Sequence, residues 1–293
     1  MQTQEKKFPS SVLPVWLSLS GMYVWILIFF TQPHKEERFL FPIYPFFCLC
    51  GAVTLTEAQK LFHCMFYSGS RHHYSASSTW FAVSICVVFS LLSLSRSSAL
   101  YYGYHAPMDL YIELNHMSSK LEQPFPPDKP INMCVGKEWY RFPCSFFLPS
   151  ERWYLQYIRS EFRGQLPKAY GEGANATKII PTHMNDMNIE EPTRYISITK
   201  CDFLVDLETE TETEWEPNFV KRTKDWEVMI KKPFLDAEKS HRLFRAFYVP
   251  FVSHRYTKYL NYVLLRSLRK TNGKAKKGKE KKQVVREDEP KIK

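Results

Sequence analysis

Three long runs without Asp, Glu, Lys, Arg or His fall within the first hundred residues, and they restrict what this chain can fold into. The charge-free runs are residues 8–33, 39–56 and 74–95. A membrane-crossing helix needs roughly 20 mainly apolar residues, so we predict three membrane helices over residues 11–31, 39–60 and 76–95. The first run exceeds the ~7–15 apolar residues of a cleaved signal peptide. A buried helical core of a soluble domain is the alternative, but three such runs in one hundred residues would be unusual.

Most of the positive charge lies at the carboxy terminus. The formal net charge is +10, and residues 266–293 contribute +8 of it through twelve Lys/Arg and four Asp/Glu. A segment with so little to bury is predicted to be disordered. Because no aromatic residue interleaves these cations, stacking on bases is disfavoured, and we expect no nucleic-acid partner.

Basic residues beside the apolar runs predict which side of the membrane each loop faces. Lys6 and Lys7 precede the first run, and the short loop between the second and third runs carries Lys60, Arg71, His72 and His73. Short basic loops favour the cytoplasm, so residues 34–38 and all residues after 100 are predicted to lie on the opposite side, which is lumenal or extracellular. The triplet N-A-T that begins at Asn175 is an N-glycosylation acceptor, which is usable only on that side.

Residues 101–265 are predicted to form a small α/β domain. The segments INMCVG (131–136) and CDFLVDL (201–207) are rich in the branched and aromatic residues typical of strands. WYLQYIRSEF (153–162) fits a strand or a short helix, and SHRLFRAFYVPF (240–251) has the apolar spacing of a helix that ends before its proline.

Three of the seven cysteines fall in this predicted lumenal domain, so one internal disulfide can form and one thiol remains. A bond between Cys134 and Cys201 would join the two clearest strand candidates. Spacing does not choose between it and the two pairings that involve Cys144. No spacing of Cys and His typical of a metal site is present, and we predict no metal.

Five consecutive ionisable residues interrupt the apolar sequence at "HKEER", residues 34–38. Lys35 and Arg38 suit a phosphate, Arg through a bidentate fork and Lys as a point charge. Glu36 and Glu37 could orient those cations or accept hydrogen bonds from sugar hydroxyls. The alternative is an interfacial hairpin whose charges pair with one another and mark the water boundary.

"HKEERF" followed by "LFPIYP" resembles the signature of the family-22 glycosyltransferases, and the resemblance continues along the chain. The further motifs are "GYHAPMDLY", "NMCVGKEWYRFPCSFFLP", "SEFRGQLPKAYGEG", "PTHMNDMNIEEPTRYI" and "RAFYVPF". Several long motifs in the same order make this resemblance specific, and it covers nearly all of the chain except the tail.

The resemblance implies a multi-pass endoplasmic-reticulum membrane protein of the GT-C fold, in which helices over residues 1–100 precede the lumenal α/β domain. It also implies transfer of mannose, in α-1,2 linkage and with inversion, from dolichyl-phosphate-mannose to a dolichol-linked oligosaccharide in N-glycosylation. Lys35 and Arg38 would then lie near the donor phosphate with His34 as a further donor, organised by Glu36 and Glu37. No cofactor or metal is implied.

One departure from the family pattern concerns the catalytic residue. Family members have roughly twice this length, and their proposed catalytic acid lies in a loop with no counterpart here. We therefore expect a fragment or short isoform. Its catalytic residue is unknown from the sequence, and Asp109, just beyond the third predicted span, is a candidate. Glu138, Arg141 and Arg163 are expected to be paired charges or to shape an acceptor groove. Two alternative functions stay open: a sister transferase acting on a glycolipid anchor, and a non-catalytic membrane subunit or regulator.

Overall fold

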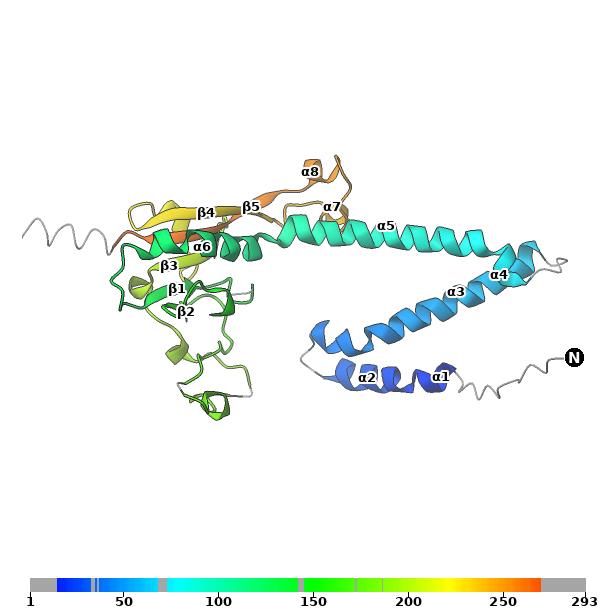
Figure 1. Cartoon of the computed structure of the whole chain (residues 1–293), viewed down its shortest axis with the longest axis horizontal. Helices are drawn as coiled ribbons and strands as arrows, with labels where there is room; N and C mark the ends of the chain where they lie inside the picture. Colours follow the sequence, from blue (N-terminus) through cyan, green and yellow to red (C-terminus); the bar gives the residue numbers. More distant parts are fainter. Residues whose placement is uncertain are drawn as a thin grey trace, which may run out of the picture. The chain divides into compact units, whose positions relative to one another are not determined.

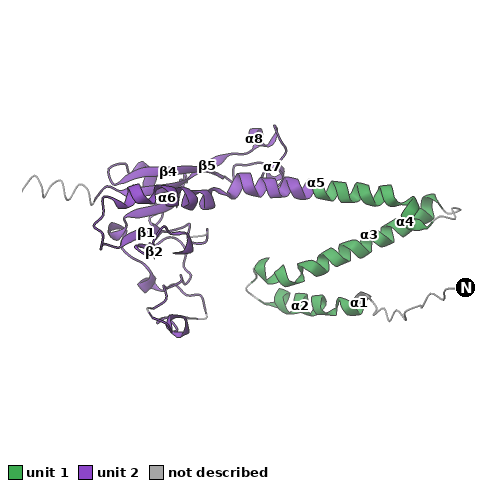
Figure 2. Ribbon diagram, viewed as in Figure 1, with its two compact units in different colours: residues 1–91 green, residues 92–293 purple. Residues whose placement is uncertain are grey.

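The computed structural model describes residues 15–32, 35, 37–67, 73–141, 145–171, 173–185 and 187–269. The elements are labelled in Figure 1. The chain divides into two compact units, residues 1–91 (unit 1) and 92–293 (unit 2), which Figure 2 shows in different colours. The division falls inside one helix, α5 (Thr79–Tyr104).

Unit 1 is built from helices. They are α1 (Val15–Ser18), α2 (Ser20–Thr31), the 3-10 helix η1 (Glu37–Ile43), α3 (Tyr44–Phe66), α4 (Tyr74–Ser77) and the first half of α5. Pro42 lies in η1, and Pro45 lies in the first turn of α3. The N–H groups in the first turn of a helix have no acceptor within the helix, so a proline there removes no helical hydrogen bond. Neither proline therefore has to kink α3.

Two helical stretches in the described part of the chain are long and apolar enough to cross a membrane, Glu37–Phe66 and Thr79–Tyr104. They correspond to the spans predicted over residues 39–60 and 76–95. The span predicted over residues 11–31 begins outside the described residues, and its described part contains α2, an apolar helix of 12 residues. A third crossing therefore stays a prediction.

Unit 2 is built on a five-stranded mixed sheet with the strand order β2-β1-β3-β5-β4. The strands are β1 (Ile131–Val135), β2 (Trp153–Tyr157), β3 (Phe203–Leu207), β4 (Trp226–Leu235) and β5 (Tyr259–Ser267). Strand β1 is parallel to its neighbours β2 and β3, whereas β5 is antiparallel to its neighbours β3 and β4.

Helix α6 (Ala106–Glu122) packs against β4 and β5. Its Leu110, Tyr111, Leu114 and Leu121 recur at helical spacing and are buried in the same cluster as the strand residues. The shorter elements of unit 2 are α7 (Arg242–Ala246), α8 (Ser253–Tyr256), η2 (Ser145–Phe147), η3 (Ala176–Lys178), η4 (Pro192–Arg194), η5 (Ile198–Lys200) and η6 (Phe219–Lys221).

The strand predictions are confirmed, and the helix prediction is wrong in extent. Both INMCVG and CDFLVDL contain a strand, and WYLQYIRSEF is a strand over its first five residues. In the segment 240–251, however, α7 ends at Ala246 and Phe247 is extended. The helix ends early because the backbone N–H and carbonyl of Tyr248 form hydrogen bonds with Ser95 on α5 instead of within a helix. Strand β5 also continues to Ser267, two residues past the predicted end of the domain.

One disulfide joins Cys134 on β1 to Cys201, two residues before β3. Both side chains are fully buried. Of the three pairings that the sequence left open, this is the one that links the two predicted strands. Cys144 lies outside the described residues.

Candidate functional site

A cavity of about 280 Å³ lies between α2 and η1 in unit 1. Its walls are Phe29, Phe30, Lys35, Glu37, Phe39 and Leu40. Four of these six residues are apolar, and the two charged ones come from the HKEER segment. The cavity therefore combines an apolar wall with one ammonium and one carboxylate, a combination suited to an amphiphile with an anionic headgroup.

Aromatic packing fixes the α2–η1 turn that forms this cavity. The indole Nε1 of Trp25 donates a hydrogen bond to the carbonyl oxygen of Phe39 at 2.7 Å. The rings of Phe29 and Phe39 lie 5.4 Å apart between centroids, an ordinary distance for an aromatic pair. Met22 and Ile43 are buried in a small apolar cluster below. An apolar α2 followed by an aromatic-rich η1 thus holds the charged segment at a helix end.

The structure describes three residues of the HKEER segment, Lys35, Glu37 and Arg38. The Glu37 carboxylate accepts a hydrogen bond from the Tyr44 hydroxyl at 3.2 Å. The Arg38 guanidinium lies 5.8 Å from the centroid of the Phe39 ring. His34 and Glu36 lie outside the described residues. The sequence singled out the charges, but it gave no signal for the aromatic wall, which depends on α2 folding back beside η1.

Asp109 lies in unit 2, in the first turn of α6. Its Oδ1 lies 2.8 Å from Nδ1 of His105, one helical turn earlier. The carboxylate is 44% exposed, so it is open to a substrate hydroxyl. The helix dipole favours a carboxylate in the first turn of a helix. The position of Asp109 therefore also has a purely structural explanation.

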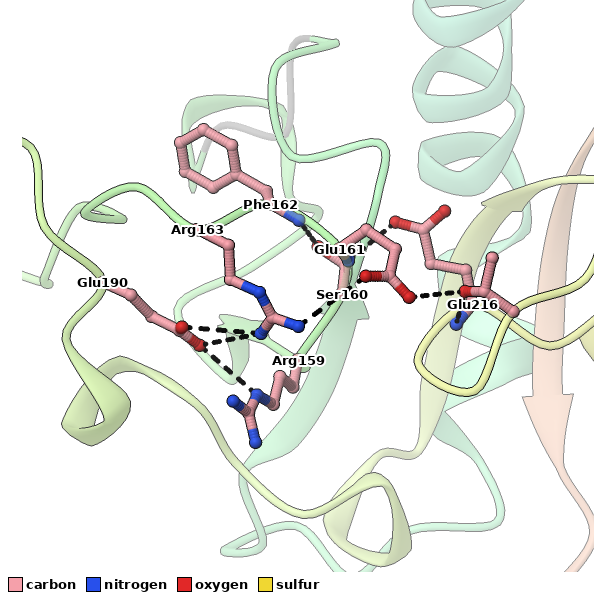
Figure 3. A network of polar contacts seen from close by, with 8 residues as sticks. Arg159, Ser160, Glu161, Phe162, Arg163, Glu190 and Glu216 are labelled. Atoms are coloured by element: carbon pink, nitrogen blue, oxygen red, sulfur yellow. Dashed lines mark hydrogen bonds and ion pairs between the residues drawn. The ribbon is translucent and has the colours of Figure 1, made fainter.

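A network of charged side chains joins the β2–β3 connection to the β3–β4 connection (Figure 3). Glu190 lies 3.3 Å from Arg159 and 3.4 Å from Arg163, and Arg163 lies 3.6 Å from Glu161. The Glu216 carboxylate accepts a hydrogen bond from the backbone N–H of Glu161 at 2.9 Å. These contacts tie two long loops together, and they confirm the expectation that Arg163 is a paired charge.

Two buried carboxylates at the sheet are each paired with a half-buried cation, Asp206 with Lys137 at 3.4 Å and Glu138 with Arg141 at 2.6 Å. Burial raises the pKa of Asp206 to about 7, although Lys137 opposes it. Burial likewise raises the pKa of Glu138 against the effect of Arg141. Burial also raises the pKa of the adjacent Tyr262 well above its ordinary value, and among the described residues its hydroxyl has no hydrogen-bond partner.

The paired-charge expectation for Glu138 and Arg141 is thus confirmed, but sequence reasoning missed Lys137 and Asp206. The available signal was the carboxylate of Asp206 inside the otherwise apolar strand FLVDL. Asn175, the predicted glycosylation acceptor, precedes η3 and is exposed. Among the described residues, no group of three or more His, Cys, Asp or Glu is arranged to hold a metal ion.

Residues 2–149 match the model of the Alg9-like mannosyltransferase family. The chain belongs to this family. The resemblance inferred from its motifs is thereby confirmed, and the matched residues include the α2–η1 cavity, Asp109 and β1. Alg9-like proteins are membrane glycosyltransferases, and the two apolar helical stretches of this chain agree with that character.

Relatives within the Alg9-like family match most of the chain. Alpha-1,2-mannosyltransferase ALG9 of Mus musculus is 53% identical over 266 residues, which are 90% of this chain and 43% of the relative. The protein of the same name from Homo sapiens is 54% identical over 254 residues, 86% of this chain and 41% of the relative. The Drosophila melanogaster relative is 47% identical over 265 residues, which are 89% of this chain and 42% of the relative. This chain thus spans about two fifths of the length of these relatives, and no solved structure matches it.

Proposed function

We propose that this chain forms part of an α-1,2-mannosyltransferase that moves mannose from dolichyl-phosphate-mannose to a dolichol-linked oligosaccharide in N-glycosylation. The observation that carries the proposal is the identity of 53% to the mouse α-1,2-mannosyltransferase over 90% of the chain. The cavity between α2 and η1 supports it, because an isoprenoid phosphate needs an apolar wall with a cation at one end.

In this proposal the HKEER segment binds the donor phosphate. Lys35 lines the cavity beside the aromatic wall, Arg38 supplies a bidentate fork, and His34 is a further donor. Glu36 and Glu37 orient the cations, and Glu37 is itself fixed by Tyr44. Positive charge at this place stabilises the dolichyl phosphate as it leaves. Because the leaving group is already a phosphate on a lipid, we propose that transfer needs no metal and no other cofactor.

The acceptor hydroxyl must lose its proton to a carboxylate as the sugar bond forms. Asp109 is the candidate we propose for this base. Its bond to His105 keeps the carboxylate oriented while leaving it open to solvent. Attack from the face opposite the phosphate converts the β-linked donor into an α-linked product, with one bond formed and one broken.

We propose that the protein is located in the endoplasmic-reticulum membrane, with unit 2 in the lumen. The disulfide between Cys134 and Cys201 supports this side, because disulfides persist in oxidising compartments such as the lumen. An exposed acceptor triplet at Asn175 is consistent with it. The partners are then the two dolichol-linked substrates and the lipids of that membrane.

A chimera tests this function. The chain replaces its matching segment in the mouse relative, and membranes containing the chimera receive dolichyl-phosphate-mannose and a truncated lipid-linked oligosaccharide in the presence of a chelator. We expect a new α-1,2-linked mannose on the lipid-linked product. The relative without this segment is the control. A chimera that is produced and inserted but transfers no mannose would contradict the proposal.

Within that chimera, we expect Arg38→Lys to lower kcat/KM for the donor about tenfold. Lysine keeps the charge but loses one hydrogen bond of the guanidinium fork, about 1.4 kcal/mol. The matched control is Lys60→Arg on α3, an exposed cation paired with Glu57 at 2.7 Å, which should leave kcat/KM unchanged. Equal activity of the Arg38→Lys variant and its parent would remove Arg38 from the donor site.

A further inference from the structure

The connection between β4 and β5, residues 236–258, is a folded extension of that strand pair. It contains α7 and α8. The backbone N–H of Asp236 donates to the carbonyl of Lys258 at 2.9 Å, and that of His241 donates to Tyr256 at 3.0 Å. The rings of Phe244 and Tyr256 stack at 4.6 Å. This β4–β5 connection therefore has a defined shape.

Hydrogen bonds attach the β4–β5 connection to α5, beside which Figure 1 shows α7. The backbone N–H of Tyr248 donates to the carbonyl of Ser95 at 3.0 Å, and the Ser95 hydroxyl donates to the Tyr248 carbonyl at 2.9 Å. Arg96 donates to the carbonyl of Ala246 at 3.0 Å. The ring of Tyr248 also lies 4.8 Å from that of Tyr102. The attachment is therefore specific.

The point of attachment lies where the apolar part of α5 ends. The charge-free run finishes at Ser95, and Arg96 is the first ionisable residue after it. Tyr101 and Tyr102 follow and are more than half exposed. Tyrosine and a snorkelling cation are typical of the boundary between hydrocarbon and water. The β4–β5 connection is thus held at the level of that boundary.

The tip of the β4–β5 connection presents large apolar side chains to the outside. Phe251 is 87% exposed, and Leu243, Val249 and Tyr256 are each at least two fifths exposed. Phe251 has a φ of 63°, a left-handed conformation that is costly for a bulky residue. The turn is fixed from within, because the buried Ser253 hydroxyl accepts a hydrogen bond from the backbone N–H of Val249 at 2.8 Å. The fold therefore accepts backbone strain to hold an exposed phenylalanine.

Charge around this tip is mainly positive, although Asp236 and Glu238 lie at the start of the connection and Lys239 is paired with Glu210. Residues 239–258 contain five Lys/Arg and no Asp or Glu. Two of these cations, Arg242 and Arg255, are exposed beside the apolar side chains. Apolar and aromatic residues combined with cations are the composition of segments that lie in the headgroup region of a bilayer.

We propose that the β4–β5 connection enters the membrane interface beside α5, with Phe251 and Leu243 among the lipid acyl chains and the arginines at acidic headgroups. Unit 2 is then held to the bilayer at a second point besides its helix. The occupant of this apolar surface is lipid, because the surface is continuous with a helix that itself meets lipid. This inference requires α5 to span the membrane and is independent of mannose transfer.

Photo-crosslinking tests the proposal on the full chain in vesicles of phosphatidylcholine and phosphatidylserine. Benzoylphenylalanine replaces Phe251 in one variant and Ile180 in the control, which is 80% exposed but lies in a loop far along the chain from α5. After irradiation, mass spectrometry identifies what has been attached at each position. We expect phospholipid adducts at position 251 to exceed those at position 180 several-fold. Equal adducts at both positions, or cross-links from 251 to a second copy of the chain, would overturn the proposal.

Discussion

Replacing Cys134 and Cys201 together by serine is expected to lower the free energy of unfolding of unit 2 by about 4 kcal/mol, because the bond closes a long loop. The two cysteines are 67 residues apart in the sequence, and both are fully buried. They tie β1 to the segment that enters β3, its parallel neighbour. Without the bond, the unfolded chain regains the entropy of that loop and the folded sheet keeps its hydrogen bonds.

Pulse proteolysis in urea on the detergent-solubilised protein measures this loss. Cys86→Ser is the matched control, because Cys86 is a free and exposed cysteine of α5, and it should leave the midpoint unchanged. Adding a reductant to the parent should reproduce the effect of the double variant. A loss below about 1 kcal/mol would mean that the unfolded chain stays compact enough to lose little loop entropy.

The two strands that the sequence predicts most clearly, β1 and β3, are short and nearly all apolar. INMCV and FLVDL are buried along almost their whole length, so composition identifies them. Two strands, β4 and β5, were not predicted. The sequence of β4, WEVMIKKPFL, carries two lysines and a proline. It lies at an edge of the sheet, where a strand tolerates both kinds of residue. Its strand character therefore comes from pairing with β5 more than from composition.

The candidate site shows the same division between local and tertiary information. The sequence identifies the charges of HKEER because they interrupt apolar runs. It cannot identify Phe29 and Phe39 as walls of one cavity, since that depends on the turn fixed by Trp25. The carboxylate of Asp206 inside an apolar strand is a sequence signal, but the sequence does not show that Lys137 is its partner, because charged residues are usually exposed. Only the fold shows that these two lie against each other.

The stability of unit 2 is expected to fall as pH rises from about 4 to about 7, because Asp206 binds a proton more tightly in the folded protein. Its pKa is raised from 3.8 to about 7 by burial, a change that Lys137 partly offsets. In this range the folded protein keeps a proton that the unfolded chain releases. Each unit of pH therefore removes about 1.4 kcal/mol, and above the folded pKa the loss is complete.

Asp206→Asn removes the titrating group, so the decline of stability with pH should become much shallower. A smaller decline should remain, because burial also raises the pKa of Glu138. The control is Asp225→Asn: bonding to Arg269 lowers the pKa of Asp225, so its contribution is lost as pH falls, and the decline toward pH 7 should persist. Urea midpoints between pH 4.5 and 8 measure these slopes. If Asp206→Asn declines as steeply as the parent, Asp206 is ionised throughout this range, and the ion pair with Lys137 outweighs the cost of burying it.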